Sequence, residues 1–349
     1  MESAMFDLND EKIIQEIISN TLPFVYNKKG SESLQYIYEY YQEHREEIFN
    51  RIEPDFAEIS KSEYGNYLII KIIKIDPDKK LKIFSKLKDN ILEFCKNKYG
   101  TYIIQALIEN FPFDCLVEIY RKLKGHFVEL IKDQSGNRVV QQLIENQSKE
   151  QNKKIFEEIK NNLIELSKNT YGCYTIQKLL KNCDDDVYEE IIKEVFNNAN
   201  ELIQDETGHY LIQYFLKAAT EKDRNNLDKI YPAIQGKIFE YSMDKIRAHI
   251  IEGALKYGNQ LQRKNIIKEI LELDKVKEDC LASLSVNAYG NYVVKLLLNY
   301  ADKEEQIYMV KKILSDPYIK RGVGKSKYIV DYIKYLNVLL KGAFDNLLL

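Results

Sequence analysis

The most regular feature of the chain is a pattern of apolar positions that recurs along its length. Segments such as YGNYLIIKII from Tyr64, YGCYTIQKLL from Tyr171 and YGNYVVKLLL from Tyr289 place apolar residues at two adjacent positions and again four residues further on. Residues four apart lie on the same face of an α-helix, so we expect Ile176 and Leu180 to be buried together. The pattern predicts a helix that begins at the glycine of each segment.

The pattern returns at a nearly constant spacing, and we call the glycine at its start the marker of a repeat. The markers are residues 30, 65, 100, 136, 172, 208, 247 and 290, with Arg247 in place of glycine. The first six markers are 35 or 36 residues apart, and the last two intervals are 39 and 43 residues. A period near 36 residues indicates helical repeats that each pack on their neighbours.

An amphipathic segment precedes each marker, as EEIFNRIEPDFAEISKSE precedes Gly65, so we expect each repeat to be a helical hairpin. The glycine is expected to allow a tight backbone turn at the start of the second helix. A capping helix is predicted around residues 10–22, with Asn9 or Asp10 as its N-cap. The sequence thus predicts one all-α solenoid domain over residues 1–349. Its caps are expected at about residues 1–22 and 309–349, and Ser326 marks a final degenerate copy within the second cap.

Composition excludes several other classes of protein. The chain is 45% hydrophobic with only 14 glycines and 6 prolines, which favours helices with short connections. The five cysteines form no C-x-x-C pair and the four histidines lack metal-ligand spacing, so we expect reduced thiols, no metal and no cofactor. The N-terminus lacks a secretory signal pattern, and no apolar run approaches the roughly 18 residues of a membrane span. We therefore expect no membrane association.

One face of the second helix carries similar residue types in most repeats. Counted from the marker, its first, second and fifth residues lie on one side, and we call them the reading face. The first residues are Ser31, Asn66, Thr101, Asn137, Cys173, His209, Ala248 and Asn291. The second residues are Glu32, Tyr67, Tyr102, Arg138, Tyr174, Tyr210, His249 and Tyr292. The fifth residues are Gln35, Ile70, Gln105, Gln141, Gln177, Gln213, Glu252 and Lys295.

These residue types suit the unstacked bases of a single-stranded nucleic acid. The second residue is aromatic or Arg in seven of eight copies, and stacking on a base contributes about 1–3 kcal/mol. The fifth residue is Gln or Glu in six of eight, and such groups read base edges through paired hydrogen bonds. Apart from Glu32 and Ile70, we predict base-edge contacts from the first and fifth residues and stacking from the second. The tyrosines that precede the marker glycines are expected to pack between repeats: Tyr64, Tyr99, Tyr171 and Tyr289.

The formal net charge of −3 argues against a nucleic acid as partner, because phosphate binding usually leaves a basic footprint. The sixth and ninth residues of the second helices, however, are mostly basic where they are charged. They include Lys71, Lys74, Lys178, Lys181, Lys217 and Lys256, against Glu109 and Glu145. Even with Glu32 and Glu39 of the first repeat included, the groove is net positive, so we expect an acidic outer surface and a moderate salt dependence.

With these positions the chain resembles the Pumilio (PUF) family. The core G-[N/S/C]-[Y/R/H]-x-x-[Q/E] at a period of about 36 residues, in eight copies with two caps, is similar to the family's array over nearly the whole chain. As in the family, the seventh copy has Glu252 at the fifth position, and the eighth, after a long spacer, has Asn291 and Tyr292. The resemblance implies a right-handed, crescent-shaped α-solenoid of eight PUF repeats. It also implies binding of single-stranded RNA, one base per repeat, with the RNA antiparallel to the chain.

The family's code carries over wherever the residues match. Asn137 with Gln141 implies uracil, and Glu252 implies guanine although Ala248 replaces the usual serine. Adenine is implied by two pairs, Cys173 with Gln177 and Ser31 with Gln35. The resemblance therefore implies a site that begins UGUA and continues with about four A/U-rich bases.

Several copies depart from the family pattern. Lys295 replaces a Gln, so Asn291 and a phosphate contact are expected to hold the first uracil. His209 replaces Asn, which leaves the third base open, and Ile70 and Thr101 are also unusual. We therefore expect specificity to be concentrated in repeats four to seven.

The resemblance favours cytoplasmic control of mRNA stability and translation through 3′ untranslated regions. A monomer is expected, with a deadenylase or a translational repressor as partner on the convex face. Two alternatives stay open, a nucleolar PUF-like factor that binds pre-ribosomal RNA and a protein-binding scaffold of the HEAT or armadillo kind. The chain has no glycine-rich phosphate loop, H-E-x-x-H or G-x-S-x-G motif, so we do not expect an enzyme.

Overall fold

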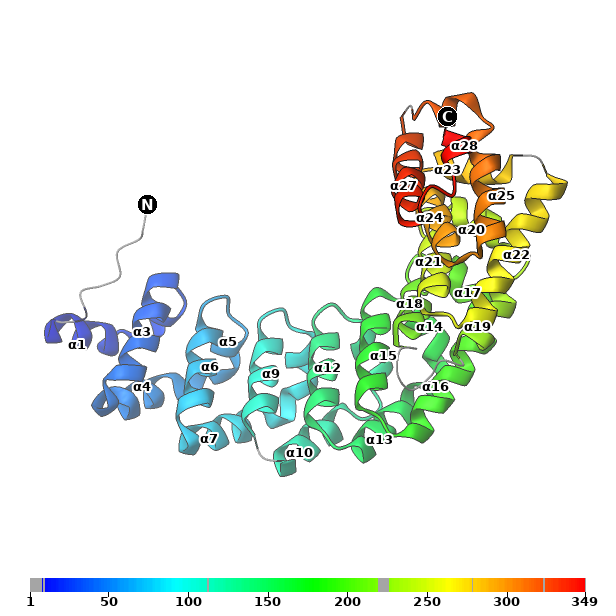
Figure 1. Ribbon diagram of the computed structural model, residues 1–349. Coiled ribbons are helices and arrows are strands. Elements are labelled where there is room, and N and C mark those ends of the chain that lie inside the picture. Colours follow the sequence, from blue (N-terminus) through cyan, green and yellow to red (C-terminus); the bar gives the residue numbers. More distant parts are fainter. Residues whose placement is uncertain are drawn as a thin grey trace. The chain divides into compact units, whose positions relative to one another are not determined.

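The computed structural model describes residues 8, 10–111, 113–218, 226–277, 279–322 and 324–348. In these residues the chain folds into helices and turns without a β-strand (Figure 1). It divides into two compact units, unit 1 with residues 1–191 and unit 2 with residues 192–349. No helix in the described part of the chain is long and apolar enough to cross a membrane.

Each repeat contains three helices, in place of the hairpin that the sequence predicts. The first helices are short: α2 (Thr21–Val25), α5 (Phe56–Ser60), α8 (Ile91–Lys96), α11 (Phe127–Lys132), α14 (Leu163–Ser167), α17 (Ala199–Gln204), α20 (Ile238–Met243) and α23 (Cys280–Val286). The second helices carry the reading face: α3 (Lys28–Tyr40), α6 (Gly65–Ile75), α9 (Gly100–Asn110), α12 (Gly136–Asn146), α15 (Thr170–Asn182), α18 (His209–Ala218), α21 (Ala248–Tyr257) and α24 (Gly290–Tyr300). The third helices are α4 (Arg45–Ile52), α7 (Pro77–Leu87), α10 (Phe113–Leu123), α13 (Lys149–Ile159), α16 (Asp185–Asn197), α19 (Asn226–Ile234), α22 (Gln260–Val276) and α25 (Lys303–Leu314).

The third helix of one repeat and the first helix of the next are separate because the chain turns between them. In the segment before the second repeat, the 3-10 turn η2 (Glu53–Asp55) contains Pro54, which has no amide hydrogen to continue α4. The turns η3 (Lys88–Asn90) and η4 (Lys160–Asn162) separate the corresponding helices of later repeats without a proline. The break frees the short helix to bury its own apolar side chains, such as Phe56, which is 2% exposed.

The marker glycines are required by a close contact between helices. The chain turns just before several of them, as at residues 61–64 and 133–135, but the turn does not use a left-handed glycine. The φ angles of the marker glycines are not in the left-handed region. A Cβ on Gly136 would lie 2.9 Å from the carbonyl oxygen of Leu130, and one on Gly290 would lie 2.8 Å from that of Leu284. The absence of a side chain therefore lets the start of the second helix lie directly against the end of the first helix.

A recurrent side-chain cap, which the sequence analysis missed, fixes the start of the second helix. An Asn or Asp stands three residues before the marker in repeats three to eight. Its side-chain oxygen accepts hydrogen bonds from the amide groups of the marker and of the residue before it. These residues are Asn97, Asp133, Asn169, Asp205, Asp244 and Asn287.

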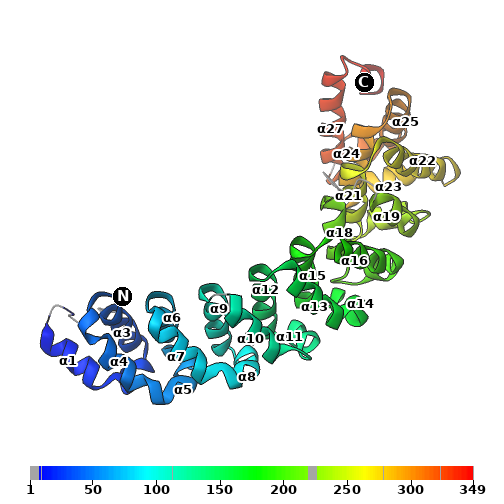
Figure 2. The same ribbon diagram turned by 90° about the horizontal axis from the view of Figure 1, so that it is seen from below.

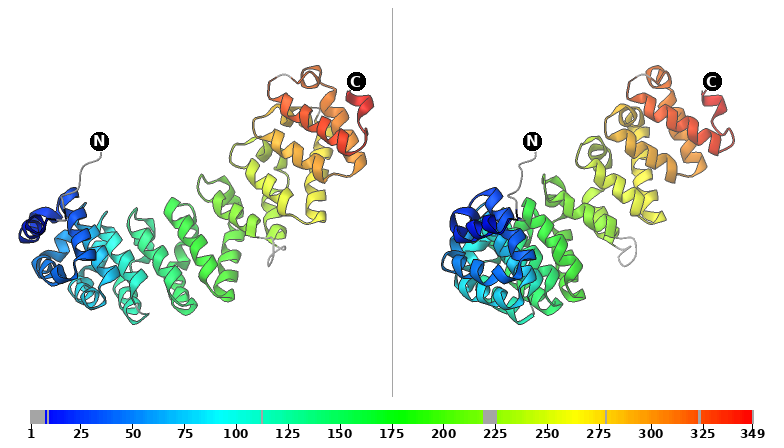
Figure 3. Two further views of the ribbon diagram at one scale, coloured as in Figure 1. Left: turned by 60° about the vertical axis from the view of Figure 1, so that its left-hand side comes forward. Right: turned by 90° about the vertical axis from the view of Figure 1, so that its left-hand side faces the viewer.

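Within each unit the second helices stack in chain order, which confirms the predicted all-α repeat architecture. In unit 1, α3, α6, α9, α12 and α15 each contact the next (Figure 1). Figure 2 shows α6, α9 and α12 along one side of unit 1 and α5, α8 and α11 along the other. In unit 2, α18, α21 and α24 contact in the same order and are followed by α27 (Ser326–Leu339). From two further directions, the corresponding helices of neighbouring repeats run roughly parallel within a unit (Figure 3).

The ends of the chain carry additional helices where caps are predicted. Asp10 is the N-cap of α1 (Glu11–Ser19) and accepts a hydrogen bond from the amide of Lys12, while Asn9 lies outside the described residues. The predicted C-terminal cap contains the end of α25, then α26 (Pro317–Lys320), α27 and α28 (Asp345–Leu348). The long interval before the eighth marker holds α22, which has 17 residues.

Candidate nucleic-acid interface

The reading face has three levels of exposure that recur in successive repeats. The first residues are buried, from 0% exposed for Ala248 to 3% for His209. The fifth residues are half-buried. The second residues project into solvent, with 48% of Tyr102 and 59% of Tyr174 exposed. Arg138 and His249 are exposed at the same position, as are Tyr67, Tyr210 and Tyr292. Exposed rings beside partly covered polar groups are the arrangement that the sequence predicts.

Asparagine at the first position is oriented by the backbone of its own helix. Nδ2 of Asn137 donates to the carbonyl oxygens of Asp133 at 2.7 Å and Gln134 at 2.8 Å. Asn66 and Asn291 make the same pair of bonds. Because carbonyl groups only accept, Nδ2 must face them and Oδ1 must face away. The Asn137 side chain therefore presents a hydrogen-bond acceptor to the reading face.

Hydroxyl groups at the first position bond instead to the next repeat. Ser31 Oγ donates to the carbonyl oxygen of Tyr64 at 2.7 Å, and Thr101 Oγ1 donates to that of Ser135 at 3.1 Å. These bonds use the hydroxyl hydrogen, so the oxygen itself remains an acceptor.

The amide of the fifth residue is held by the first residue of the same helix. Nε2 of Gln141 donates to Asn137 Oδ1 at 2.9 Å, and Nε2 of Gln177 lies 3.4 Å from Cys173 Sγ. The same contact joins Gln35 to Ser31 and Gln105 to Thr101. The amide of the fifth residue therefore points its nitrogen at the first residue whether that residue is Asn, Cys, Ser or Thr.

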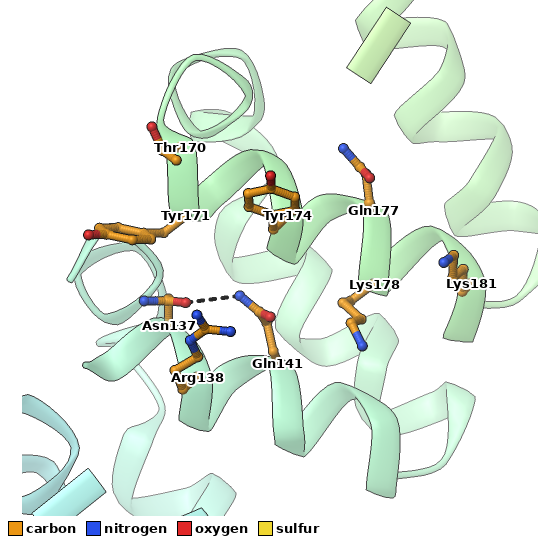
Figure 4. Close-up of a pocket in the computed structure, with 9 residues that line it drawn as sticks. All are labelled: Asn137, Arg138, Gln141, Thr170, Tyr171, Tyr174, Gln177, Lys178 and Lys181. Atoms are coloured by element: carbon orange, nitrogen blue, oxygen red, sulfur yellow. Dashed lines mark hydrogen bonds between the residues drawn. The ribbon is translucent and has the colours of Figure 1, made fainter. Parts of the chain in front are cut away.

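A cavity of about 470 Å³ lies between α12 and α15, where two neighbouring reading faces meet. Arg138 and Tyr174 face it from adjacent helices, with the amides of Asn137 and Gln141 at its wall (Figure 4). Tyr171, which the sequence analysis assigned to packing, is half-buried and also lines the cavity. The cavity thus offers flat groups and amides together, as a base requires.

Unit 2 has a smaller cavity of about 190 Å³ between α18 and α21. Gln213, His249 and Glu252 line it together with Lys256. The carboxylate of Glu252 lies 3.3 Å from His249 Nδ1 and 3.3 Å from Lys256 Nζ. Ala248 is buried and has no polar atom to place against a base edge, while the contact predicted for it stays a prediction. Glu252 is therefore the polar reading group of this repeat.

The comparison with protein families decides what these repeats are. A model described as the Pumilio-family RNA binding repeat matches residues 55–88, 90–123, 126–160, 162–196, 198–227, 249–271 and 280–314. The chain belongs to the Pumilio family. The first predicted copy, around residue 30, lies outside the matched segments, although α3 packs on α6 as the other second helices do.

Solved structures of Pumilio-family domains share the fold. The Puf3 RNA binding domain bound to a Cox17 RNA 3′ UTR recognition sequence is 26% identical, with a TM-score of 0.81 over 93% of this chain and 97% of that one. PUF-8 in complex with PBE-RNA is 19% identical, with a TM-score of 0.80 over 96% and 95%. The Puf4 RNA binding domain bound to an HO endonuclease RNA 3′ UTR recognition sequence is 23% identical, with a TM-score of 0.74 over 88% and 97%. Curated protein sequences gave no significant match.

Two Pumilio repeats in unit 2 depart from the usual reading face. His209 is buried, and its Nδ1 lies 3.1 Å from the carbonyl oxygen of Asp205. The ammonium of Lys295 lies 5.5 Å from the ring centre of Tyr292 and 5.7 Å from that of Tyr328. Tyr328 was missed in the sequence, although it stands two residues after Ser326 as Tyr292 stands two after Gly290.

The groove charges that the sequence predicts are partly paired within the Pumilio array of unit 1. Lys71 Nζ lies 2.7 Å from Glu39, and Lys178 pairs with Glu145. Each of these bonds joins the ninth residue of one second helix to the sixth residue of the next. Phosphate groups must therefore compete with carboxylates for these lysines, which lowers the net gain from each contact.

In the described ranges, no three His, Cys, Asp or Glu side chains are grouped so that they could hold a metal ion.

Proposed function

We propose that this chain binds single-stranded RNA sequence-specifically, one base per repeat, at a UGUA-containing, A/U-rich element of mRNA 3′ untranslated regions. The observation that carries this proposal is the recurrence, from repeat to repeat, of a buried first residue, a half-buried fifth residue and an exposed second residue. Two solved relatives, the Puf3 and Puf4 domains, are bound to 3′ UTR recognition sequences, which supports this class of ligand.

Repeat four has the hydrogen-bond pattern that complements uracil. Oδ1 of Asn137 faces the groove as an acceptor and suits the N3–H group of the base. Nε2 of Gln141 donates to Asn137 Oδ1 at 2.9 Å and to Thr175 Oγ1 at 3.3 Å, and the longer bond to Thr175 is the one that a uracil carbonyl oxygen would replace. Arg138 and Tyr174 then cover the two faces of the base from neighbouring helices.

Repeat seven complements guanine through a single carboxylate. The two oxygens of Glu252 can accept from guanine N1–H and N2–H, a pair of donors that the other bases do not offer. His249 and Lys256 hold the carboxylate while no base is bound. His249 can then stack on the base, because its ring is exposed beside Glu252.

Recoding of repeat five tests the proposal. Fluorescence anisotropy on short RNAs that begin UGUA, with each base permuted in turn, should show selective binding by the natural chain. Cys173→Asn should shift the preferred fourth base from A toward U, because an asparagine oxygen would replace the sulfur that now faces Gln177.

In this variant the base preferences at the first three RNA positions should be unchanged. Glu150→Gln, at an exposed position of α13, should change no base preference and serves as the control. Equal binding of the permuted and scrambled RNAs would overturn the function. An unchanged fourth base with other preferences intact would instead overturn the assignment of repeats to bases.

We further propose that the bound chain acts in the cytoplasm as a monomer and recruits a deadenylase or a translational repressor. A reporter mRNA with the element in its 3′ untranslated region should lose expression when the natural chain is present. Tyr174→Ala should relieve that loss because it weakens RNA binding. Repression that persists with a scrambled element would contradict this role.

A further inference from the structure

We infer that His209 reads uracil at the third base, with the neutral imidazole presenting Nε2 as the acceptor that asparagine presents in other repeats. This inference rests on the proposed function and deepens it, because the family pattern leaves the base of repeat six open. It depends on a geometric equivalence between histidine and asparagine at the first position.

His209 makes the backbone contact of the asparagines that it replaces. Nδ1 lies 3.1 Å from the carbonyl oxygen of Asp205, four residues earlier. Asn137 and Asn291 donate to the carbonyl oxygens four residues before them, at 2.7 and 2.8 Å. His209 is also as buried as these residues, at 3% exposed. The ring therefore lies in the same register, attached at the same point of the helix start.

This contact determines the tautomer of the ring. A carbonyl oxygen only accepts, so Nδ1 must carry the hydrogen and donate it. In the neutral ring Nε2 then carries a lone pair, which corresponds to asparagine Oδ1. Burial lowers the pKa of the His209 imidazole, and the nearby His249 lowers it further, while Asp205 and Asp244 act in the opposite direction. The ring is thus neutral at physiological pH.

The residues around His209 complete a site for a pyrimidine. The Tyr210 ring centre lies 4.0 Å from that of His209, so the exposed tyrosine ring packs against the buried imidazole. Gln213 stands at the fifth position and lines the cavity between α18 and α21. A uracil there can donate N3–H to Nε2 and accept from the Gln213 amide. Adenine and cytosine present an acceptor at the corresponding edge position and lack this donor.

Protonation should reverse this preference. With a proton on Nε2, the ring presents a donor to uracil N3–H, and two donors repel, whereas cytosine N3 is an acceptor. Uracil binding therefore weakens as the pH falls through the pKa of the free protein, and cytosine binding strengthens. An asparagine has no such proton, so the effect belongs to histidine alone.

The test measures dissociation constants for four RNAs that differ only at the third base of UGUA, at about pH 7.5 and about pH 5.5. At the higher pH the natural chain should prefer uracil by about tenfold, the effect of one well-made hydrogen bond. At the lower pH the ratio of uracil to cytosine binding should fall by several-fold. His209→Asn should keep the uracil preference and lose its pH dependence, and His209→Ser should shift the preference toward adenine.

Two results would overturn the inference: a third-base preference other than uracil, or a uracil-to-cytosine ratio in the natural chain that stays constant with pH. The fourth base, which is assigned to Cys173 and Gln177, serves as the internal control. If its adenine preference holds while the third base fails, only the role of His209 is wrong. If neither base is discriminated, the proposed function itself is wrong. Circular dichroism at both pH values confirms that the chain remains folded.

Discussion

The two units hold the fifth residue of the reading face by different means. In unit 1 neutral amides bond to the first residue of the same helix, as Gln141 does to Asn137. In unit 2 Glu252 is held by its neighbours His249 and Lys256, and Lys295 lies among tyrosine rings. In unit 1 the first residue thus holds the side-chain amide of the fifth residue. In repeats seven and eight of unit 2 the charge of the fifth residue itself governs the contact.

The largest effect should come from neutralising the charge on which repeat seven depends. Glu252→Gln should weaken binding of UGUA RNA by up to about 3 kcal/mol, because a hydrogen bond to a carboxylate is stronger than one to an amide. The preference for G at the second base should be lost, as measured by competition between RNAs. Glu272→Gln, on the exposed surface of α22, should leave both quantities unchanged. A variant that still selects G would show that the charge of the fifth residue does not govern base contact in unit 2.

Loss of a stacking ring should have a smaller effect that is equal in the two units. Tyr174→Ala in unit 1 and Tyr210→Ala in unit 2 should each weaken RNA binding by about 2 kcal/mol, because each removes one exposed stacking surface. Tyr174→Phe keeps the ring and should bind nearly as the natural chain does. Stacking does not depend on how the fifth residue is held, so a large difference between the two alanine variants would contradict the shared register.

A methyl group at a marker should destabilise the fold without changing base preference. In Gly136→Ala the new Cβ meets the Leu130 carbonyl oxygen and side chain at 2.9 Å, and overpacking of this kind costs at least about 1 kcal/mol. Thermal unfolding should show a lower Tm for this variant. An equal Tm for Gly136→Ala and the natural chain would rule out the close contact.

The smallest effect concerns the paired lysines of unit 1. Glu145→Gln should release Lys178 for a phosphate and raise RNA affinity by less than about 1 kcal/mol, because exposed ion pairs contribute little. The salt dependence of binding should become steeper, as measured by titrations at several ionic strengths. Glu157→Gln, whose pair with Lys160 joins α13 to the turn that follows it, should change neither quantity.

Much of the reading face could be predicted because its signal is periodic. A single exposed ring would indicate little, but Tyr67, Tyr102 and Tyr174 all stand two residues after a marker, which indicates one register. Register places Ala248 at the first position although it has no polar atom, so its base contact stays a prediction. Tyr328 was missed because its copy lacks the marker glycine.

The three-helix repeat was not predictable from the amphipathic pattern. The third helix of one repeat and the first helix of the following repeat each bury an apolar stripe. In the sequence their two patterns therefore look like one amphipathic segment. The bonds from Ser31 to Tyr64 and from Thr101 to Ser135 join residues 33 and 34 positions apart, and no local pattern reports them. Likewise, the pairing of Lys71 with Glu39 depends on the stacking of α3 on α6.

The amino-acid sequence by itself determined the repeat, its period and the residue types of the reading face, because each is a property of spacing along one helix. The tertiary structure decided which atom each of those residues presents. Asn137 and His209 both bond to a backbone carbonyl group four residues earlier, and that bond selects the atom left for a ligand. Hydrogen-bond direction depends on what the folded backbone places nearby, so it could not be inferred from residue type alone.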